Sequence, residues 1–138
     1  MKILALTTAL LISLSSAVTE ADSETIHNLL QDYATHGAIS PDEKQGEQLW
    51  QKTFNYDGEF PERSCASCHT KDLTASGKHV KTNKVIKPMA PSSNSERFTD
   101  SIKIEKWFKR NCLWTIAREC TAQEKANFLV YLNKTVKF

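Results

Sequence analysis

The sequence has little net charge and no run of alternating apolar and polar residues long enough to form a sheet. Its 138 residues include 18 lysines and arginines against 16 aspartates and glutamates, a balance that argues against a nucleic-acid partner. Apolar positions recur at helical spacing instead of the alternation that is typical of strands. The sequence therefore predicts an all-α domain.

Long apolar runs are also missing, except near the N-terminus. Residues 3–14 are mostly apolar and uncharged, and they are followed by small residues. This pattern predicts a secretory signal peptide over residues 1–17, with cleavage after Ala17 as the first choice and after Ala21 as the second. An uncleaved anchor is the alternative, although the run is short for a membrane span. We therefore expect an exported protein that is soluble in its mature form.

Cysteine is scarce, and two of the four cysteines belong to one motif. Cys65, Cys68 and His69 form C-x-x-C-H, the spacing at which two thiols bond covalently to a haem while the next residue ligates its iron. A zinc site would need a second pair of ligands at knuckle spacing, and Cys112 and Cys120 stand too far apart for that. A thioredoxin-like redox pair would need a βαβ pattern, which is absent. We therefore predict one covalently bound haem c in a periplasmic protein.

Helical spacing divides the mature chain into two parts. Residues 22–36 form the first predicted helix, with Ser23 as its N-cap and Gly37 as its stop. We assign residues 18–40 to an N-terminal helical extension and residues 41–138 to the haem domain.

Three longer helices are predicted within the haem domain. One opens at Ser40, one follows Thr99 as its N-cap, and the last begins at the capping box of Thr121 and ends near Lys134. Gly46 costs its helix about 1 kcal/mol relative to alanine, so we expect it to permit a close crossing with the C-terminal helix. A crossing of the first and last core helices beside a C-x-x-C-H loop resembles the class I cytochrome c fold.

The segments on either side of the motif are polar. Residues 70–95 lack helical periodicity, so we expect an extended loop that wraps the haem. Arg63 lies just ahead of the motif. It could pair with a haem propionate, although a solvated loop arginine is the more common interpretation.

The second axial position of the iron decides what such a protein does. A firm ligand restricts the protein to electron transfer, whereas a weak or absent ligand admits small molecules. Met89 lies in a proline-flanked loop after the motif and is one candidate, with packing on the porphyrin as its alternative role. The other candidates are His79, His27, His36 and Asn111. For the three histidines, simple exposure to solvent is the alternative.

Asn111 continues the apolar face that Ile104, Trp107 and Phe108 form at helical spacing. Burying an amide without a partner costs about 1 to 3 kcal/mol. We therefore expect Asn111 either to cap the end of its helix, which is the commoner role, or to bind something.

Cys112 and Cys120 can form a disulfide only if the chain between them turns back. Eight residues of continuous helix would separate their Cα atoms by about 12 Å, and a disulfide tolerates no more than about 7 Å. If formed, the bridge would pin the part of the chain that carries Asn111.

Five stretches of the sequence carry a resemblance to a known family. They are RSCASCHT at 63–70, VIKPMAPS at 85–92, ERFTD at 96–100, KIEKWFKRNC at 103–112 and REC at 118–120. Together they resemble the oxygen-binding monohaem cytochromes of the sphaeroides haem protein (SHP) family. The likeness covers roughly residues 46–132 and does not extend to the helix at 22–36. It implies His69 as the proximal ligand, Asn111 as the sixth ligand and a Cys112–Cys120 disulfide, with Met89 in a matching loop but not bound to iron.

The resemblance also implies a function. Members of the SHP family bind oxygen and nitric oxide when reduced, and they are associated with dihaem c-type and membrane b-type cytochromes as electron partners. An amide oxygen is a hard, weak ligand that suits ferric iron better than ferrous iron, so reduction should release Asn111 and let a diatomic molecule bind. A simple electron shuttle with His69 and Met89 as ligands is the alternative. The sequence has no distal histidine and arginine pair that would indicate a dedicated enzyme such as a peroxidase.

Overall fold

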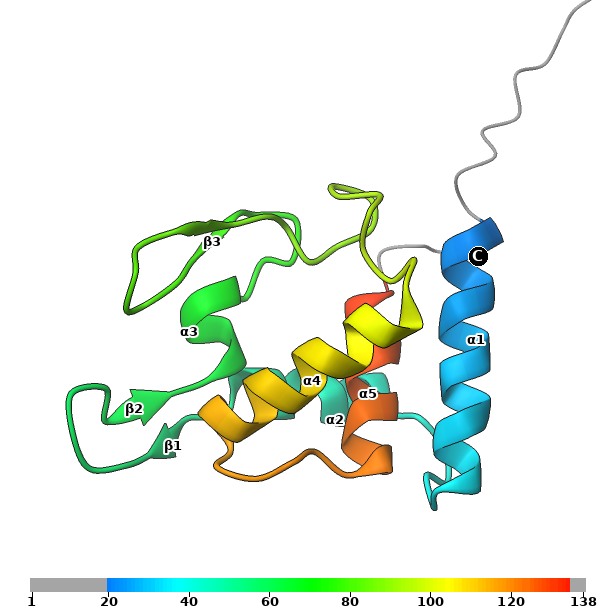
Figure 1. The fold of residues 1–138 in the computed structure, drawn as a ribbon, viewed down its shortest axis with the longest axis horizontal. Coiled ribbons are helices and arrows are strands. Elements are labelled where there is room, and N and C mark those ends of the chain that lie inside the picture. The colour runs from blue at the N-terminus through cyan, green and yellow to red at the C-terminus, as the bar shows by residue number, and fades with distance from the viewer. Residues whose placement is uncertain (1–19, 135–138) are drawn as a thin grey trace, which may run out of the picture.

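The computed structural model describes residues 20–134, which form five helices and four very short strands (Figure 1). The helices are α1 (Glu20–Thr35), α2 (Glu43–Gln51), α3 (Cys65–His69), α4 (Ser101–Thr115) and α5 (Ala122–Leu132). The strands are β1 (Phe54–Asn55), β2 (Glu62–Arg63), β3 (Gly77–Lys78) and β4 (Val85–Ile86). The predicted all-α class is confirmed. The predicted signal peptide, residues 1–17, lies outside the described residues.

The strands form two isolated antiparallel pairs. In one pair Phe54 of β1 lies opposite Arg63 of β2, and in the other Gly77 of β3 lies opposite Ile86 of β4. The second pair folds part of residues 70–95 into an arm beside α3 (Figure 1), so the segment that we expected to be an extended loop also carries a short antiparallel pair. That it wraps the haem stays a prediction. Strands of two residues are too short to leave an alternating pattern in the sequence.

Two helices begin slightly later than predicted, because an aspartate replaces a neighbouring serine or threonine as the cap. Asp42 rather than Ser40 caps α2, and Asp100 rather than Thr99 caps α4. Each carboxylate accepts a hydrogen bond from the third backbone amide of its helix, at 2.9 and 3.0 Å. A carboxylate also interacts favourably with the positive end of the helix dipole, which a neutral hydroxyl does less well.

The start of the last helix, α5, was predicted correctly, but the start of the first helix, α1, was not. α5 begins as predicted, since Thr121 Oγ1 accepts from the Glu124 amide and the Glu124 carboxylate accepts from the Thr121 amide at 2.9 Å. α1 begins at Glu20, so the predicted N-cap Ser23 lies inside the helix. Gly37 follows its end with a φ of 93°, as expected of a stop.

α2 and α5 cross closely at Gly46, as predicted. A methyl group on Gly46 would overlap the backbone carbonyl of Asn127 and lie 2.9 Å from Tyr131 Cβ. The buried Asn127 side chain fixes the crossing, because its Oδ1 accepts from the Asp42 amide and from Gln123 Nε2, both at 2.8 Å. The crossing therefore depends on the absence of a side chain at residue 46.

We expect Gly46→Ala to lower the free energy of unfolding by about 2 kcal/mol. The new methyl group meets backbone atoms, which cannot rotate away, so overpacking should cost about 3 kcal/mol. The better helix propensity of alanine offsets about 1 kcal/mol of that loss. Urea unfolding followed by circular dichroism measures the difference. Gln48→Ala, on the exposed side of α2, is the control, and equal stability of the two variants would contradict the close crossing.

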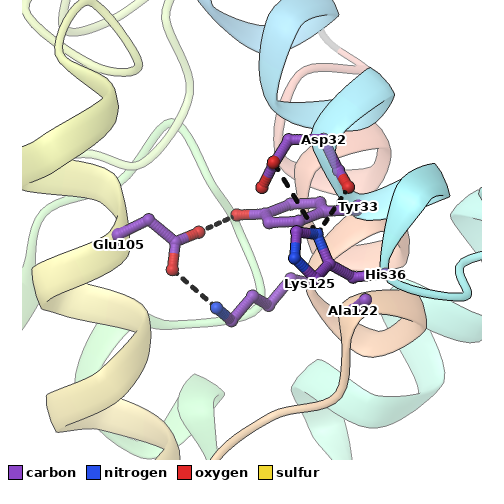
Figure 2. Close-up of a pocket in the computed structure, with 6 residues that line it drawn as sticks. All are labelled: Asp32, Tyr33, His36, Glu105, Ala122 and Lys125. Carbon is purple, nitrogen blue, oxygen red and sulfur yellow. Dashed lines mark hydrogen bonds and ion pairs between the residues drawn. The ribbon is translucent and has the colours of Figure 1, made fainter.

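α1 packs into the same core as the other helices, at one side of the molecule next to α4 and α5 (Figure 1). The buried Tyr33 of α1 donates its hydroxyl hydrogen to Glu105 of α4, whose second oxygen accepts from Lys125 Nζ of α5 at 2.6 Å (Figure 2). Burial and the neighbouring Glu105 carboxylate raise the pKa of Tyr33, so the phenol remains a donor. No helix within residues 20–134 is long and apolar enough to span a membrane.

Candidate haem-binding site

The C-x-x-C-H motif forms the short helix α3. Ser64 caps it through a capping box with Ser67, in which the Ser64 hydroxyl oxygen accepts from the Ser67 amide at 3.0 Å. Cys65 and Cys68 stand three residues apart on this helix and therefore share one face. Neither is in a disulfide. Both thiols are thus free to form thioethers.

Strand β3 packs directly against the end of α3. A methyl group on Gly77 would overlap the backbone carbonyl of Cys68 and lie 2.9 Å from His69 Cα. Only glycine allows this approach, which holds the second cysteine and the histidine of the motif against the β3–β4 arm. The sequence analysis did not single out Gly77; its isolation in a polar segment was the available signal.

His69 is half-buried, its Nδ1 atom is buried, and its imidazole is kept neutral. Burial lowers the pKa of His69 to about 4, and the positive charges of Arg97 and His79 lower it further. Among residues 20–134, His69 Nδ1 is the one buried side-chain nitrogen or oxygen without a hydrogen-bond partner. A neutral imidazole with an uncommitted nitrogen is the form that ligates a metal.

A chain of aromatic contacts joins His69 to the helix that carries Asn111. The Trp50 ring lies 5.5 Å from the His69 ring and 6.2 Å from the Phe128 ring, and Phe128 stacks at 6.1 Å on Phe108 of α4. Trp50 is held in place because its Nε1 donates to the Thr70 carbonyl at 2.9 Å. His69 and α4 therefore border one aromatic core.

Asn111 lies inside α4 and not at its end. The helix continues to Thr115, so Asn111 does not cap the helix, which was the commoner of its two expected roles. Its side chain is half-buried and makes no hydrogen bond within the described part of the chain. The other expected role, binding a group that is not part of the polypeptide, stays a prediction.

Trp107 does not share the buried face of α4 that the spacing predicted. It is 43% exposed and lies under the Arg110 guanidinium at 4.9 Å, whereas Ile104 is buried and Phe108 packs on α5. Trp107 therefore belongs to the edge of the apolar stripe.

The chain between Cys112 and Cys120 turns back, and the two cysteines form a disulfide with Cα atoms 5.6 Å apart. α4 ends at Thr115, and Ala117 has a φ of 60° in the turn that follows. The bridge fixes the residue next to Asn111.

The other candidates for the sixth ligand differ in position. Met89 is half-buried against the core, and its backbone amide donates to the Leu73 carbonyl at 3.0 Å. His79 lies in the β3–β4 arm and accepts from the Thr82 amide. His27 and His36 are exposed at α1 and contact Gln31 and Asp32. Within residues 20–134, no group of three or more histidine, cysteine or acidic side chains is placed to hold a metal ion.

Arg63 is not a solvated loop arginine. Its guanidinium lies 3.9 Å from the Trp114 ring and 4.7 Å from the Tyr56 ring, and it donates to the carbonyls of Phe60 and Trp114. These contacts could not be predicted, because Trp114 is distant from Arg63 along the chain.

Comparison with known proteins gives consistent matches. The family model described as a domain of unknown function, DUF1924, matches residues 36–132. The cytochrome c-type protein SHP of Cereibacter sphaeroides is 39% identical over 104 residues, which cover 75% of this chain and 79% of SHP. The structure of oxidised SHP, described as an oxygen-binding cytochrome c, has a TM-score of 0.71 at 37% identity and covers 79% of this chain and 96% of its own. The chain belongs to the SHP family of c-type cytochromes.

A second SHP-family relative is cytochrome c'' of Methylophilus methylotrophus. It is 45% identical over 71 residues, which cover 51% of this chain and 49% of that protein. Its oxidised crystal structure matches with a TM-score of 0.68 at 32% identity, and covers 83% of this chain and 94% of its own. Its solution structure, presented with insights into the structural basis of haem-ligand detachment, also has a TM-score of 0.68 at 32% identity and covers 87% and 97%.

Membership in the SHP family makes this protein a monohaem cytochrome with covalently bound haem c. The residues present fit that group. α3 offers two free thiols on one face, and His69 offers a neutral imidazole beside them. The predicted family, fold class and cofactor are therefore confirmed.

Proposed function

We propose that this cytochrome binds diatomic molecules when reduced, and that Asn111 controls access to the iron. Cys65 and Cys68 would attach the haem, His69 would ligate the iron, and Asn111 would be its second protein ligand in the ferric state. The observation that carries the proposal is the half-buried Asn111 amide, which lies inside α4 without a hydrogen-bond partner among the described residues.

A bound haem would supply a one-electron iron centre that side chains can ligate. His69 would ligate the iron through its neutral imidazole, which needs no proton loss to do so. Asn111 would offer a neutral amide oxygen, a hard ligand that favours ferric over ferrous iron. If reduction weakened that bond, a small molecule could bind in its place, and the Cys112–Cys120 bridge would keep the asparagine nearby.

Two relatives support this assignment. SHP is described as an oxygen-binding cytochrome c, and the solution structure of cytochrome c'' is described in terms of haem-ligand detachment. Our proposal combines the ligand detachment described for cytochrome c'' with the oxygen binding described for SHP: a protein ligand leaves the iron, and a small molecule then binds there. We also propose a periplasmic location and, from the family resemblance, dihaem c-type or membrane b-type cytochromes as electron donors.

A plain electron shuttle with His69 and Met89 as ligands is the second candidate. It is favoured by the position of Met89, half-buried against the core in a loop held by the Leu73 carbonyl. In that case the iron would keep both ligands in both oxidation states and would bind no diatomic molecule.

Asn111→Val distinguishes the two functions. Valine is similar in size to asparagine but cannot bind iron, so we expect azide to bind the ferric variant on the order of tenfold faster than the wild type, equivalent to about 1.4 kcal/mol. Resonance Raman spectra of the ferric Asn111→Val variant should show that the mutation removes the sixth ligand. Spectra of the wild type should show that reduction to the ferrous state also removes it.

Met89→Ala is the matched control and should leave the ferric spectrum unchanged. If instead Met89→Ala removes a sulfur-to-iron absorption band and the ferrous wild type refuses carbon monoxide, the shuttle is the correct function.

A further inference from the structure

The C-terminal end of α4 is held by side chains from the segment that leads into the haem motif. Arg63 Nη1 donates to the Trp114 carbonyl at 2.9 Å, and the Tyr56 hydroxyl donates to the Thr115 carbonyl at 3.0 Å. These carbonyls belong to the last turn of α4, where backbone acceptors lack a partner within the helix. The end of the asparagine-bearing helix is therefore capped from outside.

Arg63 is itself tightly placed. Its Nε donates to the Phe60 carbonyl at 3.0 Å, and its guanidinium lies between the Trp114 and Tyr56 rings. No ion pair involves Arg63 within residues 20–134. A cation at a helix C-terminus interacts favourably with the helix dipole. It also interacts favourably with the faces of aromatic rings. These two interactions stabilise the charge of Arg63 in place of an ion pair with a carboxylate.

These contacts join the segment that leads into the haem motif to the helix that carries Asn111. Arg63 pairs with Phe54 in the β1–β2 ladder and lies two residues before Cys65. Trp114, which receives its hydrogen bond, lies three residues after Asn111. Any movement of the haem-binding segment relative to the last turns of α4 must therefore stretch or break the contacts of Arg63.

The opposite half of α4 is fixed separately. Glu105, six residues before Asn111, holds Tyr33 of α1 and Lys125 of α5 (Figure 2). With that half anchored, loss of the Arg63 contacts should loosen only the turns that carry Asn111, which the Cys112–Cys120 bridge and the Tyr56 hydroxyl would still hold.

We propose that Arg63 is a positioning residue that keeps Asn111 at bonding distance from the haem iron and so sets how readily Asn111 leaves. The proposal rests on the proposed function of Asn111. Arg63 acts through α4 and contacts neither the iron nor the incoming ligand.

Arg63→Gln tests this inference in the ferric holoprotein, with azide as the probe. Losing the charged hydrogen bond to Trp114 should raise the azide binding rate about tenfold. Hydrogen exchange of the amides of residues 111–116 should also accelerate, whereas exchange in the first turn of α4 stays unchanged. Lys81→Gln is the matched control, because Lys81 lies over the same Trp114 ring at 4.8 Å but makes no hydrogen bond to α4, and it should behave as wild type.

Arg63→Lys is the second variant. It tests the role of Arg63 in the event that the Arg63→Gln protein does not fold. Lysine keeps the charge but has no planar fork to reach both the Phe60 and the Trp114 carbonyls. We therefore expect azide binding between the wild-type and the Arg63→Gln rates.

The double variant Arg63→Gln with Asn111→Val separates the inference from the proposed function. If Arg63 acts through Asn111, the double variant binds azide no faster than Asn111→Val alone. If Asn111→Val itself binds like wild type, the proposed function fails and the inference fails with it. If Asn111→Val opens the site but Arg63→Gln does not, or if Arg63→Gln adds its full effect to Asn111→Val, the inference alone is overturned.

Discussion

The variant in which Cys65 and Cys68 are both replaced by alanine will carry no haem that survives denaturation. Each thiol forms a covalent thioether in a c-type site, so without them the haem is held only by His69 and by packing. The free energy of unfolding should fall by at least about 4 kcal/mol, the contribution of a ligand present at a thousand times its dissociation constant. In a chain of this size that loss is a large part of the total stability.

Haem staining of denaturing gels measures the first effect, and chemical unfolding followed by circular dichroism measures the second. Ser67→Ala is the control, because Ser67 lies on α3 between the two cysteines and loses only its capping contacts with Ser64. It should keep its covalent haem. Covalent haem in the double alanine variant would show that attachment occurs elsewhere in the chain.

The haem motif and the α2–α5 crossing could be predicted from sequence because each depends on a constraint that few residues satisfy. Two thiols and an imidazole at fixed spacing have few alternative uses, and Gly46 inside a helix has little purpose other than close packing. Helix starts were less certain, since Ser40 and Asp42, or Thr99 and Asp100, can each act as an N-cap. Tertiary packing decides between such neighbours.

The orientation of α4 was only partly predictable. Ile104, Phe108, Cys112 and Thr115 follow the buried side of the helix, and Trp107 lies at its edge. Periodicity alone could not locate that edge, because a helical face is broad enough to include Trp107 as well. A position near this edge also explains why Asn111 is half-buried and why its side chain makes no hydrogen bond within residues 20–134.

The contacts of Arg63 and Gly77 could not be predicted from the sequence. Arg63 meets Trp114, and Gly77 meets Cys68, only because the chain folds back on itself. Arg63 lies next to the haem motif and Gly77 packs against it. The sequence around each residue does not indicate which residue it contacts. Contacts of this kind depend on topology, which single-sequence periodicity does not supply.

Removing the disulfide should affect both stability and the proposed behaviour of Asn111. For a loop as short as that between Cys112 and Cys120, the chain-entropy model gives a loss of about 2 to 3 kcal/mol. Both cysteines are buried, so alanine at each position is the appropriate replacement. The last turn of α4 would then keep the contacts of Arg63 and Tyr56 but lose its covalent link, and Asn111 should leave the ferric iron more often.

Urea unfolding of the Cys112→Ala, Cys120→Ala variant measures the first effect, and the rate of azide binding to its ferric form measures the second. The control is wild type treated with a thiol reductant, after which only the iron is reoxidised. This treatment breaks the disulfide without replacing any side chain. If both proteins lose stability but bind azide at the wild-type rate, the bridge stabilises the fold without positioning Asn111. If both bind azide faster, and the difference vanishes in the Asn111→Val background, the bridge acts on the iron site through the asparagine beside it.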